Sequence, residues 1–335
     1  MAVSSRCSWP MQASGRRTGR RRATPTSRSF CSPGVGAIPH EYHGGVTSPR
    51  IVSEHEQRAS LVPLPRSEPE VHTPPRLQDV DEWGRSERVR TIVRRVYSPV
   101  YKHWFRVEWE GLEKIPKTGG ALLICNHAAA IPSDAPVIMH GIEEELGRAV
   151  YGMADFFFRT VPWLGTAWSR AGGLSAHPDN ALRLLRDQGQ LALVFPEGTK
   201  ATSKTYRDRY RLRRFGRGGF VEIAMRAGVP VVPIVCIGAE ESMPIVFKLP
   251  TLAKIINVPY VPVTANMLLL GPLGVLAYFP SKFKLRVLDP VTFNMPSGQE
   301  RYSKSRIMDE AENIRNLMQE TIYEMLRDRR SVLFG

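Results

Sequence analysis

Short apolar runs alternating with helix-like segments are the feature that most limits what this chain can fold into. Apolar runs bounded by polar or turn-forming residues are typical of strands buried on both faces. Such runs occupy residues 120–125, 149–153, 190–195 and 231–237. Residues 135–146 and 219–227 have helical patterns. Because strands and helices alternate, we expect an α/β domain with a largely parallel central sheet flanked by helices.

A candidate acid–base pair follows the first of these runs. The run ends at Asn126 and His127, and Asp134 lies in the same strand-to-helix connection. A histidine and an aspartate in one connection can meet as a base and the group that orients it. Taken alone, a single His near a single Asp is more often incidental than catalytic. His127 and Asp134 are therefore candidates that need support from elsewhere in the chain.

A second candidate element follows the run 190–195. The segment Pro196-Glu197-Gly198-Thr199 predicts a tight turn at a strand end. Ligands of open α/β sheets collect at the carboxyl ends of strands. We therefore expect His127, Asp134 and Glu197 to surround one cleft.

The segment after Glu197 is strongly basic. It opposes one acid, Asp208, with eight cations: Lys200, Lys204, Arg207, Arg209, Arg211, Arg213, Arg214 and Arg217. Arginine binds phosphate oxygens through two parallel hydrogen bonds, so the cluster predicts a phosphate site beside the cleft. A solvated basic loop is the common alternative for such charge runs. The tight turn directly before the cluster favours the phosphate site.

The net charge of +14 indicates an anionic partner, which can be nucleic acid, an anionic bilayer or a phosphorylated substrate. Part of this charge lies in the first forty residues, which carry seven Arg and no acid. Residues 1–76 are rich in Ser, Arg, Pro and Gly and predict a disordered basic arm, with a transit peptide as the alternative. The four cysteines form no CxxC pair, which favours a reducing compartment.

Residues 77–106 predict an amphipathic helical lead-in. Its apolar positions recur at steps of three and four: Val89, Ile92, Val93, Val96 and Val100. A basic helix of this kind can lie on an anionic membrane, and a helix packed on the sheet explains the pattern equally well. Residues 107–111 predict an edge strand, and residues 305–327 predict a C-terminal helix docked on the body.

A transmembrane helix is not expected. The best candidate, residues 255–280, carries no charge, but Pro259, Pro262 and Pro272 interrupt it. A span needs about 20 apolar residues in continuous helix. The segment therefore predicts a surface that dips into lipid, or a loop that packs on the core.

The candidate residues together indicate acyl transfer to a lipid. No G-x-S-x-G elbow supplies an enzyme nucleophile, and no second histidine stands at metal-ligand spacing from His127, so a metal site is not expected. A base without an enzyme nucleophile suits attack by a substrate hydroxyl. The aromatic segment 156–164 and the apolar segment 255–279 suit an acyl chain or a bilayer surface.

From about Trp104 to Pro290 the chain resembles the lysophospholipid or glycerolipid acyltransferase superfamily, which includes 1-acylglycerol-3-phosphate acyltransferases. Four segments carry the resemblance in the family's order: Asn126-His127 with Asp134, Phe195 to Thr199, Arg214 to Phe220, and Val231 to Ile234 around Pro233. The second family block is less clear, with Gly165 and Arg170 or Gly172-Gly173 as candidates. Six residues separate His127 from Asp134 where the family usually has four, a longer form shared by a bacterial branch.

The resemblance implies roles for the candidate residues. His127 is the implied general base on an acceptor hydroxyl that attacks acyl-CoA or acyl carrier protein, and Asp134 orients it. The implied substrate-binding residues are Asn126, Glu197, Gly198, Thr199, Lys200 and Arg217. No cofactor is implied beyond the thioester co-substrate. The implied partners are an acyl donor, a lipid acceptor and an anionic membrane surface on its cytoplasmic side, with no specific nucleic acid.

The expected organisation has four parts: a disordered arm (1–76), a helical lead-in (77–106), an acyltransferase domain (107–297) and a docked C-terminal helix (298–335). Two other functions stay open at this point. One is a catalytically silent module that binds lipid or nucleic acid, and the other is a hydrolase that passes the acyl group to water.

Overall fold

A computed structural model of the chain describes residues 78–154, 162–258, 260–294 and 302–335. All of these belong to one unit, Pro69–Gly335, which joins the predicted lead-in, domain and C-terminal helix. The predicted arm and the aromatic connection at 156–158 lie outside the described residues.

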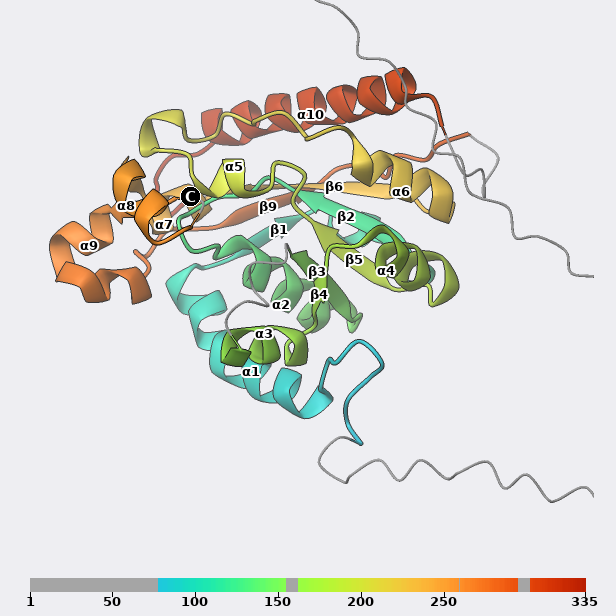
Figure 1. Ribbon diagram of the computed structural model, residues 1–335, viewed down its shortest axis with the longest axis horizontal. Coiled ribbons are helices and arrows are strands. Elements are labelled where there is room, and N and C mark those ends of the chain that lie inside the picture. The colour runs from blue at the N-terminus through green and yellow to red at the C-terminus, as the bar shows by residue number, and fades with distance from the viewer. Residues whose placement is uncertain (1–77, 155–161, 259, 295–301) are drawn as a thin grey trace, which may run out of the picture. The chain divides into compact units, whose positions relative to one another are not determined.

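A seven-stranded sheet forms the centre of this unit, in the order β1-β9-β6-β2-β5-β3-β4 (Figure 1). Its strands are β1 Glu108–Glu110, β2 Ala121–Cys125, β3 Val150–Ala154, β4 Gly173–Ser175, β5 Leu191–Val194, β6 Val231–Ile237 and β9 Lys284–Val287. Every neighbouring pair is parallel except β6 and β9, which are antiparallel. The prediction of an α/β fold with a largely parallel sheet is confirmed, and β1 is the predicted edge strand.

The central strands are apolar because both of their faces are covered. Every residue of β2 and of β6 is buried. Successive side chains of a strand point to opposite faces, so Leu122 and Ile124 join one core while Leu123 and Cys125 join the other. Because β2 is packed on both faces, the core fixes the position of its last residue, Cys125. His127 follows two residues later.

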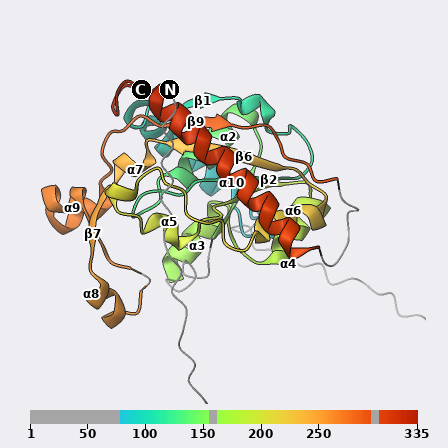
Figure 2. The same cartoon turned by 90° about the horizontal axis from the view of Figure 1, so that it is seen from above.

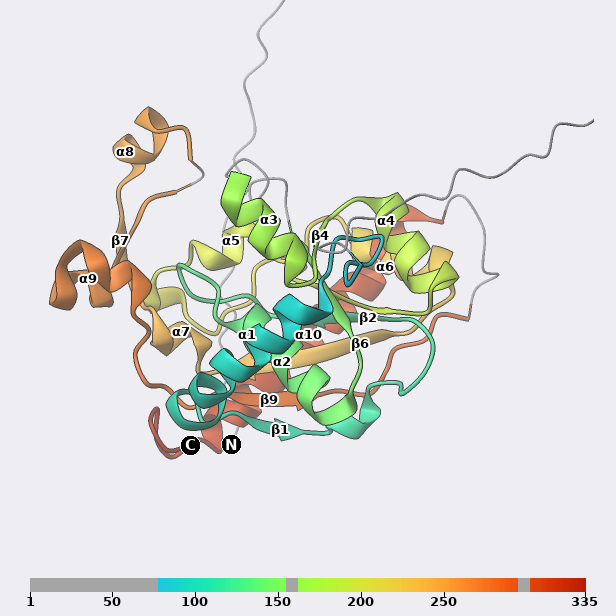
Figure 3. The same ribbon diagram turned by 90° about the horizontal axis from the view of Figure 1, so that it is seen from below.

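Helices cover both faces of the sheet. On one face lie α4 Pro178–Leu182 with η5 Arg183–Asp187, α6 Gly219–Ala227 and α10 Lys304–Arg327, and Figure 2 shows α10 crossing that face. The other face carries α1 Glu87–Pro99, the π-helical segment η2 Val100–Trp104, α2 Asp134–Leu146 and α3 Pro162–Arg170 (Figure 3). The predicted C-terminal helix is therefore docked on the sheet, as the apolar stripe of α10 indicates.

The lead-in helix α1 differs from its prediction. Ser86 caps it, since its hydroxyl accepts a hydrogen bond from the Val89 amide. The predicted apolar stripe is only partly covered, because Ile92 and Val96 are exposed. The buried side chain is instead Arg90, whose Nε lies 2.9 Å from a carboxylate oxygen of Glu143 on α2. An ion pair between helices, which periodicity does not reveal, sets the face that α1 turns inward.

The remaining elements follow the ends of the strands or lie beyond the sheet. They are η3 Leu112–Lys114, α5 Thr199–Thr202, η6 Tyr206–Asp208, α7 Ala239–Ser242, β7 Ile245–Lys248, α8 Pro250–Ile255, β8 Pro262–Thr264, α9 Ala265–Leu270 and η7 Gly271–Leu276. β7 and β8 pair with each other in a separate antiparallel sheet. Among the described residues, no helix has the length and apolar character needed to cross a bilayer.

Candidate active site

The predicted His–Asp pair meets at the end of β2. His127 follows the strand by two residues, and Asp134 is the first residue of α2. His127 Nδ1 lies 2.9 Å from Asp134 Oδ2. The aspartate side chain is fully buried, whereas the histidine side chain remains 14% exposed. The imidazole therefore stands between a buried carboxylate and an accessible surface, as a general base requires.

Asp134 is held by the backbone as well as by the imidazole. Its Oδ2 accepts from the Ala128 amide at 2.8 Å, and its Oδ1 accepts from the Ala135 amide at 2.7 Å. It also sits in the first turn of α2, where the helix dipole favours a negative charge. An ionised carboxylate only accepts hydrogen bonds, so His127 Nδ1 donates the proton it shares with Asp134. The lone pair then resides on Nε2, the nitrogen that can take a proton from a substrate.

Phe195 completes the setting of the imidazole. Its ring stacks on that of His127, with centroids 4.0 Å apart and planes inclined by 23°. Sequence reasoning placed Phe195 at a strand end but assigned it no role. The signal was present in its position directly before the Pro-Glu-Gly turn. With Asp134 on one nitrogen and Phe195 on one face, the ring has few alternative orientations.

The connection between His127 and Asp134 is longer than the family's usual one, yet it leaves the pair in contact. Ala129 takes up a left-handed conformation with φ of 69°, which few residues other than glycine adopt. Tyr260 donates to the Ala130 carbonyl at 3.3 Å, and Tyr278 donates to the Ile131 carbonyl at 3.4 Å. Ala128, Ala129 and Ser133 of this connection are buried, Ile131 is exposed, and two tyrosines from later in the chain hold its backbone.

Asn126 was predicted to bind substrate, and the structure places its amide elsewhere. Its Nδ2 donates to the Cys236 carbonyl at 2.8 Å, and its Oδ1 accepts from the Cys236 amide at 2.8 Å. The side chain is almost fully buried. Asn126 therefore ties the end of β2 to the end of β6 and so fixes where His127 begins.

Glu197 also uses its side chain within the protein. Its Oε1 accepts from the His127 amide at 3.3 Å, and its Oε2 accepts from the Arg213 amide at 2.6 Å. The carboxylate is buried. Glu197 thus connects the backbone of the His127 loop to the backbone of the basic segment. The three residues that were predicted to surround one cleft, His127, Asp134 and Glu197, do come together at one sheet edge, but the buried Glu197 carboxylate faces backbone amides.

Lys204 was predicted to belong to the phosphate-binding cluster, but its side chain is buried inside the protein. Its Nζ lies 3.0 Å from Glu240 Oε1 and 3.7 Å from Glu197 Oε2, and all three side chains are buried. Burial raises the pKa of Glu240, and the Lys204 ammonium opposes that shift. The lysine therefore balances two carboxylates beneath the site and is not free to meet a substrate.

Other predicted residues face solvent. Gly198, Lys200 and Arg217 are exposed, and Thr199 begins α5 with a side chain outside the described part of the structure. Gly216 approaches the Pro196 carbonyl, so the turn that carries Arg217 lies against the Pro-Glu-Gly turn. Lys200 is thus a cation on α5, directly after the Glu197 turn, and Arg217 is a cation on the turn that lies against it.

The described residues contain neither an activated cysteine nor a cluster of metal ligands. Cys125 and Cys236 are buried and unpaired, and burial raises the pKa of both thiols well above its usual range. Such thiols are poor nucleophiles. Within the described ranges, no group of three or more His, Cys, Asp or Glu side chains is placed to hold a metal ion.

Comparisons with known proteins identify a matching family and similar sequences. A family model described as Acyltransferase matches residues 106–237. An uncharacterized protein of Mycobacterium tuberculosis is 36% identical over 259 residues, which cover 76% of this chain and 72% of that protein. An uncharacterized protein of Mycobacterium leprae is 36% identical over 263 residues, covering 76% of this chain and 70% of the relative.

Two further similarities are more limited in extent or identity. The human "DGAT1/2-independent enzyme synthesizing storage lipids" is 31% identical over 134 residues, or 39% of this chain and 40% of that protein. The crystal structure of a 1-acyl-sn-glycerophosphate (LPA) acyltransferase from Thermotoga maritima is similar with a TM-score of 0.46 and 19% identity, over 72% of this chain and 80% of that one. The family model and the extended identity with the mycobacterial proteins show that the chain belongs to the acyltransferase family.

Proposed function

We propose that this acyltransferase moves a fatty acyl group from a thioester, acyl-CoA or acyl carrier protein, to a hydroxyl of a glycerolipid such as a lysophospholipid. The observation that carries the proposal is the His127–Asp134 contact of 2.9 Å, with the carboxylate buried and the imidazole accessible. The name of the human relative, an enzyme synthesizing storage lipids, supports a lipid product.

The chemistry follows from the orientation of the imidazole. His127 Nε2 takes the proton of the acceptor hydroxyl as the oxygen attacks the thioester carbonyl. The imidazolium that forms is stabilised by the Asp134 carboxylate, which is already aligned by two backbone amides. When the tetrahedral intermediate collapses, the ester forms and the carbon–sulfur bond breaks. The proton on His127 can then pass to the departing thiolate.

The acceptor's phosphate is assigned to the exposed cations Lys200 and Arg217. Lys200 is on α5, directly after the turn of Glu197, which accepts a hydrogen bond from the His127 amide, and Arg217 is on the turn that approaches the Pro196 carbonyl. A phosphate bound there leaves a neighbouring hydroxyl free to approach Nε2. In this assignment Glu197 shapes the acceptor site by fixing its two sides, since both of its oxygens already accept hydrogen bonds from the backbone.

Acyl release measured with and without an acceptor tests the proposal most directly. The protein is incubated with acyl-CoA alone, and then with acyl-CoA and lysophosphatidic acid, while free thiol and lipid products are followed. Acyl transfer predicts thiol release that depends on the lysolipid and an equal yield of diacyl product. Release to water at the same rate without acceptor would identify a hydrolase instead. No release with either donor type and any lysolipid or monoacylglycerol would indicate a silent binding module.

Arg217→Ala is expected to raise the KM for a phosphate-bearing acceptor by roughly tenfold, because one charge-assisted hydrogen bond is lost. The KM for the acyl donor should change little. Steady-state kinetics with each substrate varied in turn measures both constants. Arg95→Ala, on the exposed side of α1, serves as a control for loss of one positive charge. An unchanged acceptor KM in Arg217→Ala would place the phosphate elsewhere.

A further inference from the structure

An apolar lobe extends from the carboxyl-end side of the sheet. We define it as residues 245–276, which comprise β7, α8, β8, α9 and η7. Its strands pair only with each other, apart from the main sheet. In Figures 1 and 3, α8 and α9 lie beyond the layered body on the same side of it.

The lobe concentrates exposed aliphatic surface. Of the twenty-two large hydrophobic side chains exposed in the described residues, eleven lie in it: Val246, Phe247, Leu249, Leu252, Ile255, Ile256, Leu268, Leu269, Leu270, Leu273 and Leu276. Leu269, Leu273 and Leu276 are 73%, 74% and 77% exposed. Half of these exposed side chains thus fall within one segment of the chain, whereas scattered single residues are the norm on protein surfaces, and such a concentration marks an interaction site.

The positive charge of the lobe indicates which kind of partner it binds. From Ser242 to Leu288 the sequence contains five Lys or Arg residues and no Asp or Glu. Lys248 and Lys254 are exposed among the aliphatic side chains. A second copy of the chain would bring like charges together at such a surface. An anionic bilayer instead offers an apolar interior beneath a negatively charged surface, and so complements both properties.

The lobe is tied to the catalytic loop. Tyr260 lies in the lobe and donates a hydrogen bond to the Ala130 carbonyl. Tyr278 follows the lobe by two residues and donates a hydrogen bond to the Ile131 carbonyl. Ile131 itself is 38% exposed. A surface that enters lipid through α8 and α9 therefore stands beside the connection that carries His127 and Asp134.

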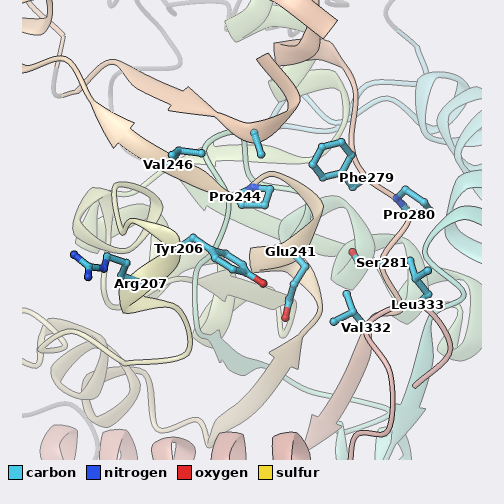
Figure 4. Close-up of a pocket in the computed structure, with 11 residues that line it drawn as sticks. Tyr206, Arg207, Glu241, Pro244, Val246, Phe279, Pro280, Ser281, Val332 and Leu333 are labelled. Carbon is cyan, nitrogen blue, oxygen red and sulfur yellow. The ribbon is translucent and has the colours of Figure 1, made fainter. Parts of the chain in front are cut away.

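Two pockets separate the lobe from the body. One, of about 720 Å³, is lined by Val246 and Phe279 on one side and Tyr206 on the other, and the Arg207 guanidinium at its edge points away from them (Figure 4). The other, of about 690 Å³, combines apolar residues of β7 and α8 with the cations Arg207, Lys248 and Lys254. Pockets that join aliphatic walls to cations suit lipid molecules at the boundary between headgroups and acyl chains.

We propose that the apolar lobe docks this protein on an anionic lipid bilayer by inserting α8, α9 and η7 into the boundary between headgroups and acyl chains. The proposal deepens the proposed function, on which it rests for the choice of lipid as partner. It assigns membrane contact to the lobe and not to α1, where Ile92 and Val96 form a smaller exposed patch.

Co-sedimentation of the full chain with vesicles tests the docking surface. Vesicles of phosphatidylcholine with phosphatidylglycerol are compared with pure phosphatidylcholine, in low salt and in about 0.5 M salt, which screens attraction by the N-terminal arginines. Leu269→Asp/Leu273→Asp is expected to weaken partitioning at least roughly tenfold, because two leucines lose their burial in lipid. Leu317→Asp/Tyr323→Asp, on the exposed side of α10, adds the same charge and should bind as the wild type does.

Three results would overturn the proposal. The first is unchanged vesicle binding by the lobe variant, and the second is loss of binding in Ile92→Asp/Val96→Asp with the lobe variant unaffected. The third is a wild-type dimer that the lobe substitutions dissociate, which would make a second copy the occupant. Acyl transfer to a short-chain acceptor dispersed as monomer is measured in parallel. Its absence in the wild type would reject the proposed function while the vesicle result still decides the docking surface.

Discussion

Replacing His127 with alanine is expected to lower kcat for acyl transfer by a factor of about 10²–10⁴, the usual contribution of a positioned general base. The structure motivates this expectation through the Asp134 carboxylate at 2.9 Å from Nδ1 and the Phe195 ring stacked on the imidazole. The carboxylate at Nδ1 leaves Nε2 as the basic nitrogen, and the stacked Phe195 ring limits the orientations of the imidazole. Lysolipid-dependent release of thiol from acyl-CoA measures the effect.

His103→Ala is the matched control, because His103 is exposed at the end of the π-helical segment. Its activity should equal that of the unmodified protein. A circular dichroism spectrum and a melting curve for each variant would separate loss of the base from loss of the fold. Full activity in a folded His127→Ala protein would reject the general-base role.

Lys204→Met is expected to lower the free energy of unfolding by about 3–5 kcal/mol, because it leaves buried carboxylates without their cation. Lys204 lies 3.0 Å from Glu240 and 3.7 Å from Glu197, and its own side chain is 2% exposed. Lys200→Met is the matched control four residues earlier, on an exposed side chain, and should change stability by less than about 0.5 kcal/mol. Urea unfolding of both variants supplies the comparison.

The destabilisation should also depend on pH. Burial already raises the pKa of Glu240, and removing Lys204 takes away the cation that opposes the shift. A carboxyl whose pKa is higher in the folded state binds more protons when folded, so stability falls as pH rises through that interval and returns on acidification. The stability gap between Lys204→Met and the wild type should therefore narrow from about pH 7 to about pH 5. A constant or widening gap would argue against an uncompensated Glu240.

Five of the seven strands of the main sheet were predicted from local pattern, whereas the short strands β4 and β9 were not. The run at 231–237 and the helix at 219–227 begin and end where the structure has them, because continuous burial and a flanking glycine are local signals. The inward face of α1 was not predictable in the same way. Its buried Arg90 depends on Glu143, which lies 53 residues later in the chain.

In the candidate site, too, contacts between residues close in sequence were predictable, and contacts between distant segments were not. His127 and Asp134 could be paired from sequence because they end one strand and begin the next helix. The contacts of Asn126, Glu197 and Lys204 join segments that only folding brings together, such as the Asn126 amide to Cys236 and the Lys204 ammonium to Glu240. The family resemblance and the run of positive charge therefore suggested substrate contacts for side chains that bind the protein's own backbone or, for Lys204, its buried carboxylates.

The six-residue connection between His127 and Asp134 has a consequence for recognising other chains. The distance between the two side chains is determined by a strand end and a helix start, both set by the core, while the chain between them turns at Ala129, which has a left-handed conformation. Connection length can therefore vary without moving either reactive group. A search pattern that demands a constant interval would discard sequences like this one, whereas a pattern anchored on the strand end and the helix start would keep them.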